Sequence, residues 1–180
     1  MNAQISPTAV IHPHVKFGKN VIVEDFCVIG VPVNGQPNLE TTIGDDSHIR
    51  SHTVIYAGNQ IGRGFRTGNK ANIRELNEIG DDVSVGTLSI IEHHVRLEDK
   101  VRVHSGVFIP EYSILRAGAW VGPGVVMTNA RYPNLPSTKH NLMGPELEAG
   151  ARIGANATLL PGVVIGRDAL VGAGAVVTKN

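Results

Sequence analysis

The chain has 180 residues, enough for one domain with a substantial core, and 42% of them are hydrophobic, an ordinary share for a globular fold. Lys plus Arg number 16 and Asp plus Glu number 16, so the formal net charge is zero. Nucleic acids and anionic membrane surfaces bind proteins with a basic surplus, so we expect neither as a partner. The N-terminal residues MNAQISPTAV lack the features of a signal peptide, and no apolar run is long enough to span a membrane, so we expect a cytoplasmic protein.

An apolar residue recurs at every sixth position along most of the chain. Of 26 such positions, 25 hold an apolar residue, and Thr67 is the exception. An α-helix would spread this step around its surface, and a simple alternating strand would not single out every third residue of one face. A short strand followed by a turn fits the step, and three such units close a triangular coil. The sequence therefore predicts an all-β parallel helix of eight to nine stacked coils, forming one domain over residues 1–180.

The predicted strands follow one another in three groups along the chain. The first group runs from Ile5 to Ile29, the second from Ile43 to Met127 and the third from Leu147 to Val177. A glycine often follows the apolar residue, where we expect it to ease the turn. A small residue or valine four positions after the apolar residue is expected to fill the corner of the triangle.

Two insertions, at about 30–42 and 128–146, interrupt the count of six. Both are rich in Pro, Asn and Gly, and both follow the same face of the triangle, so we expect two loops that leave from one vertex about five coils apart. Long loops in compact domains are often functional. We therefore expect the 128–146 loop to cover a binding cleft, and the alternative is an arm that only fastens subunits together.

Several stretches resemble the hexapeptide-repeat acyltransferase family. Residues 152–179, RIGANATLLPGVVIGRDALVGAGAVVTK, are similar to the final coils of its acetyltransferases. The stretches FRTGNKANIRELNEIGDDVSVGT, VRVHSGVFIP and VGPGVVMTN, the last followed by YP, resemble a subgroup that acylates amino groups on nucleotide-linked sugars. The resemblance implies a left-handed parallel β-helix, a homotrimer with active sites between subunits, and acetyl-CoA or another acyl-CoA as co-substrate without a metal. The implied acceptor is an amino sugar nucleotide.

Acyl transfer to an amine needs a base and a donor that stabilises the oxyanion. Histidine is the usual base near neutral pH, and we predict that His104 serves here, the alternative being a site that runs without a protein base. The subgroup carries Gln-Asn-Asn where this chain has residues 104–106, HSG. Asn129 matches the subgroup and is predicted to orient the acceptor or the loop. By the same resemblance, the CoA groove would be lined by Gly154, Ala155, Gly172, Ala173, Thr178 and Lys179.

Candidate acceptor-binding residues lie in the middle coils and in the long loop. Counting units by threes places three pairs in one vertex column beneath the loop, where they could bind the acceptor or form only an exposed charged stripe: Arg74–Glu75, His93–His94 and Glu111–Tyr112. Within the loop, His140 could reach across a subunit boundary. Tyr132 precedes a proline at the position where galactoside-type acetyltransferases carry their catalytic histidine, which makes simple galactoside O-acetylation less suited to this chain.

Other functions remain open from the sequence. Relatives continue past VTK into a tail that helps to hold CoA, whereas the last residue here is Asn180, so an acyl carrier protein is an alternative donor. O-acetylation is a further alternative. A γ-type carbonic anhydrase would need three convergent histidines, and His52, His93 and His104 do not give that family's spacing. A non-catalytic trimeric β-helix is the last alternative, because a solenoid does not establish activity.

Overall fold

The computed structural model describes residues 3–36 and 38–180, so Met1, Asn2 and Pro37 of the predicted domain and loop lie outside the described residues. The described chain forms 26 short strands and one 3-10 helix, η1 (Thr138–His140). Every apolar position of the repeat, and Thr67, falls within a strand. No helix in these two ranges has the length and apolar character needed to cross a membrane.

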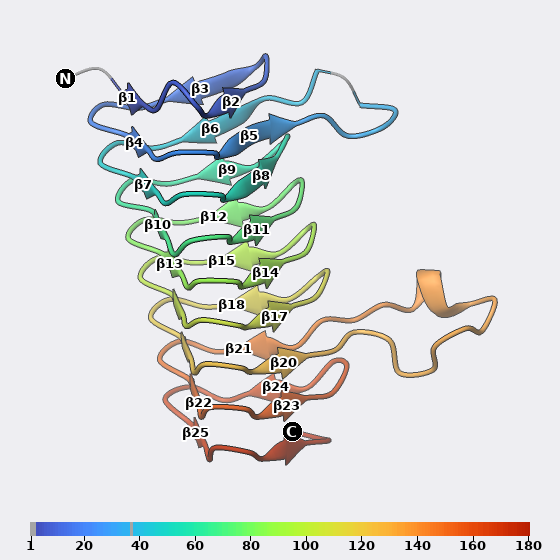
Figure 1. The fold of residues 1–180 in the computed structure, drawn as a ribbon. Helices are drawn as coiled ribbons and strands as arrows, with labels where there is room; N and C mark the ends of the chain where they lie inside the picture. Colours follow the sequence, from blue (N-terminus) through green and yellow to red (C-terminus); the bar gives the residue numbers. More distant parts are fainter. Residues whose placement is uncertain (1–2, 37) are drawn as a thin grey trace.

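The strands sort into three parallel sheets, which we name sheets A, B and C (Figure 1). Sheet A contains β1 (Gln4–Ile5), β4 (Ile22–Val23), β7 (His48–Ile49), β10 (Arg66–Thr67), β13 (Ser84–Val85), β16 (Arg102–Val103), β19 (Trp120–Val121), β22 (Arg152–Ile153) and β25 (Leu170–Val171). Sheet B contains β2 (Val10–Ile11), β5 (Val28–Val31), β8 (Val54–Tyr56), β11 (Asn72–Ile73), β14 (Ile90–Ile91), β17 (Phe108–Ile109), β20 (Val126–Met127), β23 (Thr158–Leu159) and β26 (Val176–Val177). Sheet C contains β3 (Val15–Phe17), β6 (Thr41–Ile43), β9 (Gln60–Ile61), β12 (Glu78–Ile79), β15 (Arg96–Leu97), β18 (Ile114–Leu115), β21 (Glu146–Leu147) and β24 (Val164–Ile165).

Each strand pairs with the strand three places further along the chain, so one coil consists of one strand from each sheet. Ile73, for example, aligns with Ile91, and Ile91 aligns with Ile109. The coils descend in the left-handed sense, and the predicted fold class, a left-handed parallel β-helix of eight to nine coils, is confirmed (Figure 1). We name the three edges of the prism after the sheets that the turns connect: edge AB, edge BC and edge CA.

The apolar ladder fills the interior of the prism, because the inward position of each strand stacks on the same position of the next coil. Thr67 is buried among these residues. Its hydroxyl takes the place of a backbone hydrogen-bond acceptor that sheet A lacks at this point. Strands β7 and β10 share only the register pair His48 with Arg66, and the N–H of Arg50 donates instead to Oγ1 of Thr67 at 2.8 Å. The one polar residue in the ladder therefore satisfies a backbone donor.

The glycines that follow the apolar positions have a different role from the predicted one. At Gly86 an added Cβ would lie 2.4 Å from the carbonyl carbon of His104, and at Gly154 it would lie 2.4 Å from the backbone nitrogen of Ala173. Neither glycine has a positive φ. The expectation that these glycines ease the turn is wrong, because the close approach of the next coil is what requires them. Gly172, in the last coil, has nothing within 4 Å of the added Cβ.

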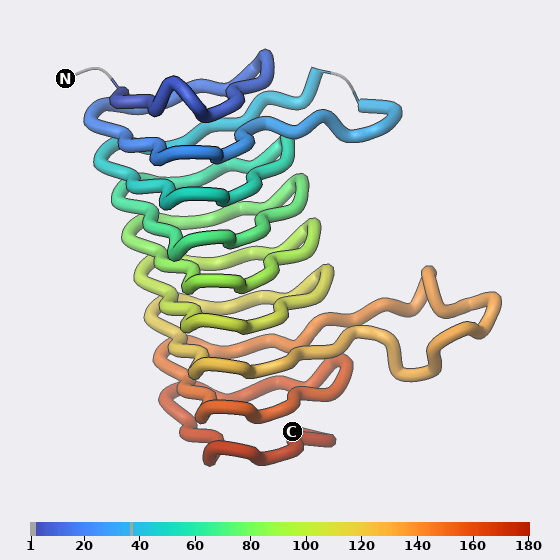
Figure 2. The backbone as a smooth tube through the Cα atoms, in the orientation of Figure 1, coloured from blue at the N-terminus to red at the C-terminus, as the bar shows by residue number. Residues whose placement is uncertain are grey.

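The two long loops leave from edge BC. The first connects β5 to β6 and the second connects β20 to β21; β5 and β20 lie in sheet B, while β6 and β21 lie in sheet C. The predicted common vertex is confirmed, and Figure 2 shows both loops projecting from the same side of the solenoid. The second loop carries η1 and extends further from the solenoid than the first.

Candidate functional site

A column of polar side chains runs down edge BC, beside the base of the second loop. Glu75, His93, Glu111 and Asn129 each stand two residues after a strand of sheet B, at a spacing of one coil. Nδ2 of Asn129 donates to Oε2 of Glu111 at 2.6 Å, and Nε2 of His93 lies 3.7 Å from Oε1 of the same carboxylate. The structure thus brings together the predicted residues Glu75, His93 and Asn129, with Glu111 linking two of them. We call these four residues the BC column.

Arg74 anchors the upper end of the BC column. Its Nε and Nη2 donate to the two carboxylate oxygens of Glu75 at 2.9 and 3.1 Å, a bidentate arrangement. Burial alone would raise the pKa of Glu75, but the hydrogen bonds and charge of Arg74 outweigh it and hold the pKa below its ordinary value. Glu75 is therefore a carboxylate at neutral pH.

Glu92 and Tyr56 belong to the same site, although sequence reasoning did not single them out. Oε2 of Glu92 lies 3.6 Å from Nη1 of Arg74, and the Arg74 guanidinium lies 4.8 Å from the ring centroid of Tyr56. Burial raises the pKa of Glu92 more than the charge of Arg74 lowers it. Both residues lie one coil, or 18 residues, from Arg74, and that spacing was the signal that could have found them.

Two histidines and a tyrosine form an aromatic cluster on the same edge. Nδ1 of His93 and Nδ1 of His94 are 2.8 Å apart, so one ring donates a hydrogen bond and the other accepts it. The ring of Tyr112 lies 5.9 Å from that of His93 and 5.6 Å from that of His94. With Glu111 on its other nitrogen, His93 has both ring nitrogens facing polar partners, which is the arrangement that fixes an imidazole for proton transfer.

Buried asparagines support this edge from inside the solenoid. Nδ2 of Asn59 and Nδ2 of Asn77 both donate to the carbonyl oxygen of Arg74 at 2.8 Å. Oδ1 of Asn77 accepts from the N–H of Val95 at 2.7 Å, and Oδ1 of Asn59 accepts from the N–H of Asn77 at 3.1 Å. The carbonyl of Arg74 is therefore held by one hydrogen bond from the preceding coil and one from its own turn.

The remaining predicted residues lie elsewhere. His104 stands at edge AB, one residue after β16, and its ring lies 4.6 Å from that of Trp120. The pairs Gly154–Ala155 and Gly172–Ala173 follow β22 and β25 at the same edge, while Thr178 and Lys179 follow β26 of sheet B. Within one chain, the two predicted catalytic residues, His104 and Asn129, therefore stand on different edges.

Tyr132 and His140 lie out in the second loop. Tyr132 is 66% exposed, and its carbonyl accepts a hydrogen bond from the hydroxyl of Thr138 at 2.7 Å. His140 is exposed at the end of η1. The loop is closed at its base, where the N–H of Met143 donates to the carbonyl of Asn129 at 2.9 Å. Asn129, the last residue of the BC column, thus also forms part of the base of the loop.

The histidines considered for a zinc enzyme do not converge within one chain. His52 and His104 stand at edge AB, whereas His93 stands at edge BC. Over residues 3–36 and 38–180, the side chains form no group of three or more His, Cys, Asp or Glu residues that could hold a metal ion.

The fold and repeat define a hexapeptide-type parallel β-helix, and comparison with known proteins agrees. Residues 144–179 match the family Bacterial transferase hexapeptide (six repeats), and residues 77–110 match Hexapeptide repeat of succinyl-transferase. These matches confirm the predicted resemblance to the hexapeptide-repeat family over those two segments.

Individual relatives are similar along nearly the whole chain. The chain is 31% identical over 170 residues to the bifunctional protein GlmU of Methylococcus capsulatus, covering 92% of this chain and 34% of that protein. It is 27% identical over 194 residues to GlmU of Nitratidesulfovibrio vulgaris, covering 98% of this chain and 37% of that protein. The chain thus spans about a third of the length of these relatives. The solved structure of Francisella novicida UDP-N-acetylglucosamine acyltransferase aligns with a TM-score of 0.46 at 19% identity, covering 94% of this chain and 67% of that chain.

Proposed function

We propose that the protein is an acyltransferase that moves an acetyl or other short acyl group from acyl-CoA to an amino group of a nucleotide-linked sugar. We further propose a homotrimer in which edge BC of one subunit faces edge AB of the next. The observation that carries this proposal is the separation of the candidate residues. Edge AB holds His104 and four residues of the proposed CoA groove, at positions 154–155 and 172–173, whereas edge BC holds Asn129 and the acceptor candidates, so a second copy is needed to bring the two sets together.

The charge of edge BC suits an amine acceptor. Three carboxylates, those of Glu75, Glu92 and Glu111, lie on this edge, and the guanidinium of Arg74 pairs with the first two of them. Their summed charge attracts an ammonium group, and the hydrogen-bond acceptors also suit sugar hydroxyls. The resemblance of residues 65–87 and 101–110 to acyltransferases of nucleotide-linked sugars supports the same acceptor.

The chemistry requires that the acceptor amine attack the thioester carbonyl after losing a proton. The new C–N bond forms as the C–S bond breaks, the base takes the amine proton, and the CoA thiolate leaves and is protonated. His104 is the proposed base, supplied by edge AB. His93 is the rival for this role, because Glu111 orients its ring. Asn129 is proposed to orient the acceptor, with His94, Tyr132 and His140 completing the acceptor side.

The test starts with calorimetric titration of the purified protein with acetyl-CoA, with free CoA as the control. Binding in the micromolar range at one site per subunit supports a CoA-dependent enzyme, and release of CoA thiol is then measured over a panel of amino-sugar nucleotides and their hydroxyl analogues. His104→Ala and His93→Ala are compared in that assay, and the base is the residue whose loss lowers kcat by about 10²–10⁴. If the protein neither binds acetyl-CoA nor turns over with an acyl carrier protein as the acyl donor, the non-catalytic trimeric β-helix is the remaining alternative.

A further inference from the structure

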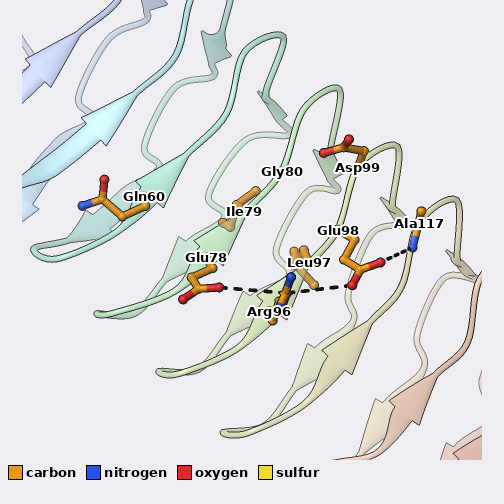
Figure 3. A pocket seen from close by; sticks show the side chains of 9 residues that line it. All are labelled: Gln60, Glu78, Ile79, Gly80, Arg96, Leu97, Glu98, Asp99 and Ala117. Atoms are coloured by element: carbon orange, nitrogen blue, oxygen red, sulfur yellow. Dashed lines mark hydrogen bonds and ion pairs between the residues drawn. The ribbon is translucent and has the colours of Figure 1, made fainter.

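The three outer faces of the solenoid differ in charge. On sheet C the charged side chains pair with one another in a ladder, which Figure 3 shows for Glu78, Arg96 and Glu98. Arg96 lies 3.9 Å from Glu78 and 3.8 Å from Glu98, and Arg116 continues the ladder to Glu146 at 2.6 Å. The outer face of sheet B is mostly apolar, with exposed Ile90 and Val126. Among the described residues of these two faces, no cationic group is left free for a ligand.

Sheet A is the exception. The register places Arg66 beside Ser84, Ser84 beside Arg102, and Arg102 beside Trp120 on successive rungs. Among the ion pairs and side-chain hydrogen bonds of the described residues, none involves the guanidinium of Arg66 or of Arg102. His48, which precedes Arg66 in this row, is paired with Glu24 at 2.7 Å, so the free cationic row begins at Arg66.

The surface around these arginines is hollowed. A depression of about 200 Å³ is lined by Arg66, Ser84, Arg102 and His104. An adjoining depression of about 370 Å³ adds Lys100 and one carboxylate, that of Asp82. Three cationic side chains against one carboxylate give this face a positive potential, which attracts anions and phosphates in particular.

An aromatic platform follows Arg102 in the row, one rung before Arg152. Trp120 is half-buried, and the ring of His104 lies 4.6 Å from it at an angle of 57°. Parallel strands are spaced by about 4.8 Å, so the three rungs from Arg66 to Trp120 span roughly 14 Å, comparable with an extended nucleoside diphosphate. Aromatic rings stack on nucleobases of any sequence, and arginines bind phosphates through bidentate hydrogen bonds.

We propose that the outer face of sheet A binds a nucleoside diphosphate. Its phosphates would lie on Arg66, Ser84 and Arg102, and its nucleobase would stack on Trp120 beside His104. The inference deepens the proposed function and rests on it for the identity of the nucleotide. The acidic edge BC disfavours a diphosphate, so a nucleotide-linked substrate needs its anionic half to be held by another surface. Uridine diphosphate would represent the acceptor, and adenosine diphosphate would represent the nucleotide half of CoA.

The chain provides its own reporter for this site, because Trp120 is its single tryptophan. Stacking of a base on Trp120 should quench the intrinsic fluorescence. Uridine diphosphate, adenosine diphosphate and inorganic pyrophosphate are titrated into the full-length protein, and affinities are measured in parallel by calorimetry. We expect one or both nucleotides to quench and pyrophosphate to bind more weakly without quenching. Preference for uridine diphosphate assigns the face to the acceptor, and preference for adenosine diphosphate assigns it to the donor.

Variants separate this site from general charge attraction. Arg66→Ala and Arg102→Ala should each weaken nucleotide binding by about tenfold or more, since each removes charged hydrogen bonds to phosphate. Arg96→Ala, on the self-paired face of sheet C, is the matched control and should leave affinity within twofold. Equal loss in all three variants, or absence of fluorescence quenching by both nucleotides, overturns the proposal.

The outcome is independent of whether acyl transfer occurs. Thiol release with no tryptophan quenching by either nucleotide would retain the proposed function and overturn this inference. Quenching that depends on Arg66 and Arg102 without any thiol release would support the nucleotide site and count against acyl transfer.

Discussion

Thr67→Val tests the structure against the repeat pattern, because the two predict opposite effects of this substitution on the stability of the fold. By the pattern, valine completes an apolar ladder whose other 25 positions are apolar, so the change should stabilise the fold. In the structure, Oγ1 of Thr67 accepts the N–H of Arg50 at 2.8 Å and lies 3.2 Å from Oγ1 of Thr53. Valine leaves the N–H of Arg50, which lies in a part-buried contact, without its acceptor, so we expect the variant to be less stable.

The magnitude follows from two opposing terms. An unsatisfied buried backbone donor costs about 1–3 kcal/mol. Replacing the hydroxyl by a methyl group gains about 0.8 kcal/mol of apolar burial. Thr53 keeps a partner, since its hydroxyl also donates to the carbonyl of Gly68 at 3.2 Å. The expected net loss in the free energy of unfolding is about 0.2–2 kcal/mol, which lowers Tm by up to roughly 8 °C for a chain of this size.

The assay is thermal and urea unfolding followed by circular dichroism at one fixed protein concentration. Thr67→Ser is the control, because it keeps the hydroxyl and should lose no more than about 1 kcal/mol. Amide exchange at residue 50 adds a local readout, which should be faster in Thr67→Val and unchanged in Thr67→Ser. A Thr67→Val protein as stable as the wild type, with normal exchange at Arg50, would refute the role given to this hydroxyl.

Further predictions test packing, charge and the loop. Gly86→Ala should cost about 1–3 kcal/mol, because its Cβ would meet the backbone of the next coil at 2.4 Å, whereas Gly172→Ala has open space and should stay within about 0.5 kcal/mol; equal urea midpoints would contradict the packing argument. Burial raises the pKa of Glu24, but hydrogen bonds from Ser51 and His48 outweigh it, so the pKa lies below the model-compound value of 4.5. Its folded-state pKa is depressed, so the stability that the carboxylate contributes is present above pH 4.5 and is lost as pH falls through the folded pKa. The stability gap between wild type and Glu24→Gln should therefore close in acid, and a gap independent of pH would refute it. Replacing residues 130–142 by a short Gly-Ser turn should leave Tm nearly unchanged, because the loop is closed at its base, and should reduce acyl transfer; full activity would remove the loop from the site.

The solenoid could be predicted from the sequence because one physical constraint repeats 26 times. Each coil buries the same inward positions on the next, so the period of six and both loop exits were visible without coordinates. The stacking of Glu75, His93 and Asn129 was accessible for the same reason, since a coil of 18 residues fixes which side chains share a column.

The sequence could not provide the contacts between side chains of neighbouring coils. It also could not provide the reason why particular positions of the repeat require glycine. The glycines of the repeat were assigned to turns, whereas Gly86 is required by the backbone of the next coil. The partner of each charge was also hidden. Arg96 and Arg102 have the same residue type and the same outward position after a turn, yet Arg96 is paired with two carboxylates and Arg102 has no such partner among the described residues. Those differences depend on what lies one coil above and below on each face.

The placement of the two predicted catalytic residues on different edges supports one decisive experiment on assembly. Suppose that each site joins edge AB of one subunit to edge BC of the next. His104→Ala then damages only the edge AB side of a site, and Asn129→Ala damages only the edge BC side. Trimers formed from an equal mixture of these two inactive chains would contain some sites in which both the edge AB side and the edge BC side are intact. In a trimer that contains both chains, one of the three interfaces combines an intact His104 with an intact Asn129, so about a third of the sites in doubly tagged assemblies are complete.

The two variants are co-expressed with different affinity tags, and doubly tagged assemblies are assayed for thiol release. Each variant expressed alone, purified in the same way, is the control. Recovered activity well above the sum of the two controls supports a site shared between subunits. Mixed assemblies as inactive as either parent would place both residues in the same site of one chain or outside the site, and would overturn the shared-cleft proposal.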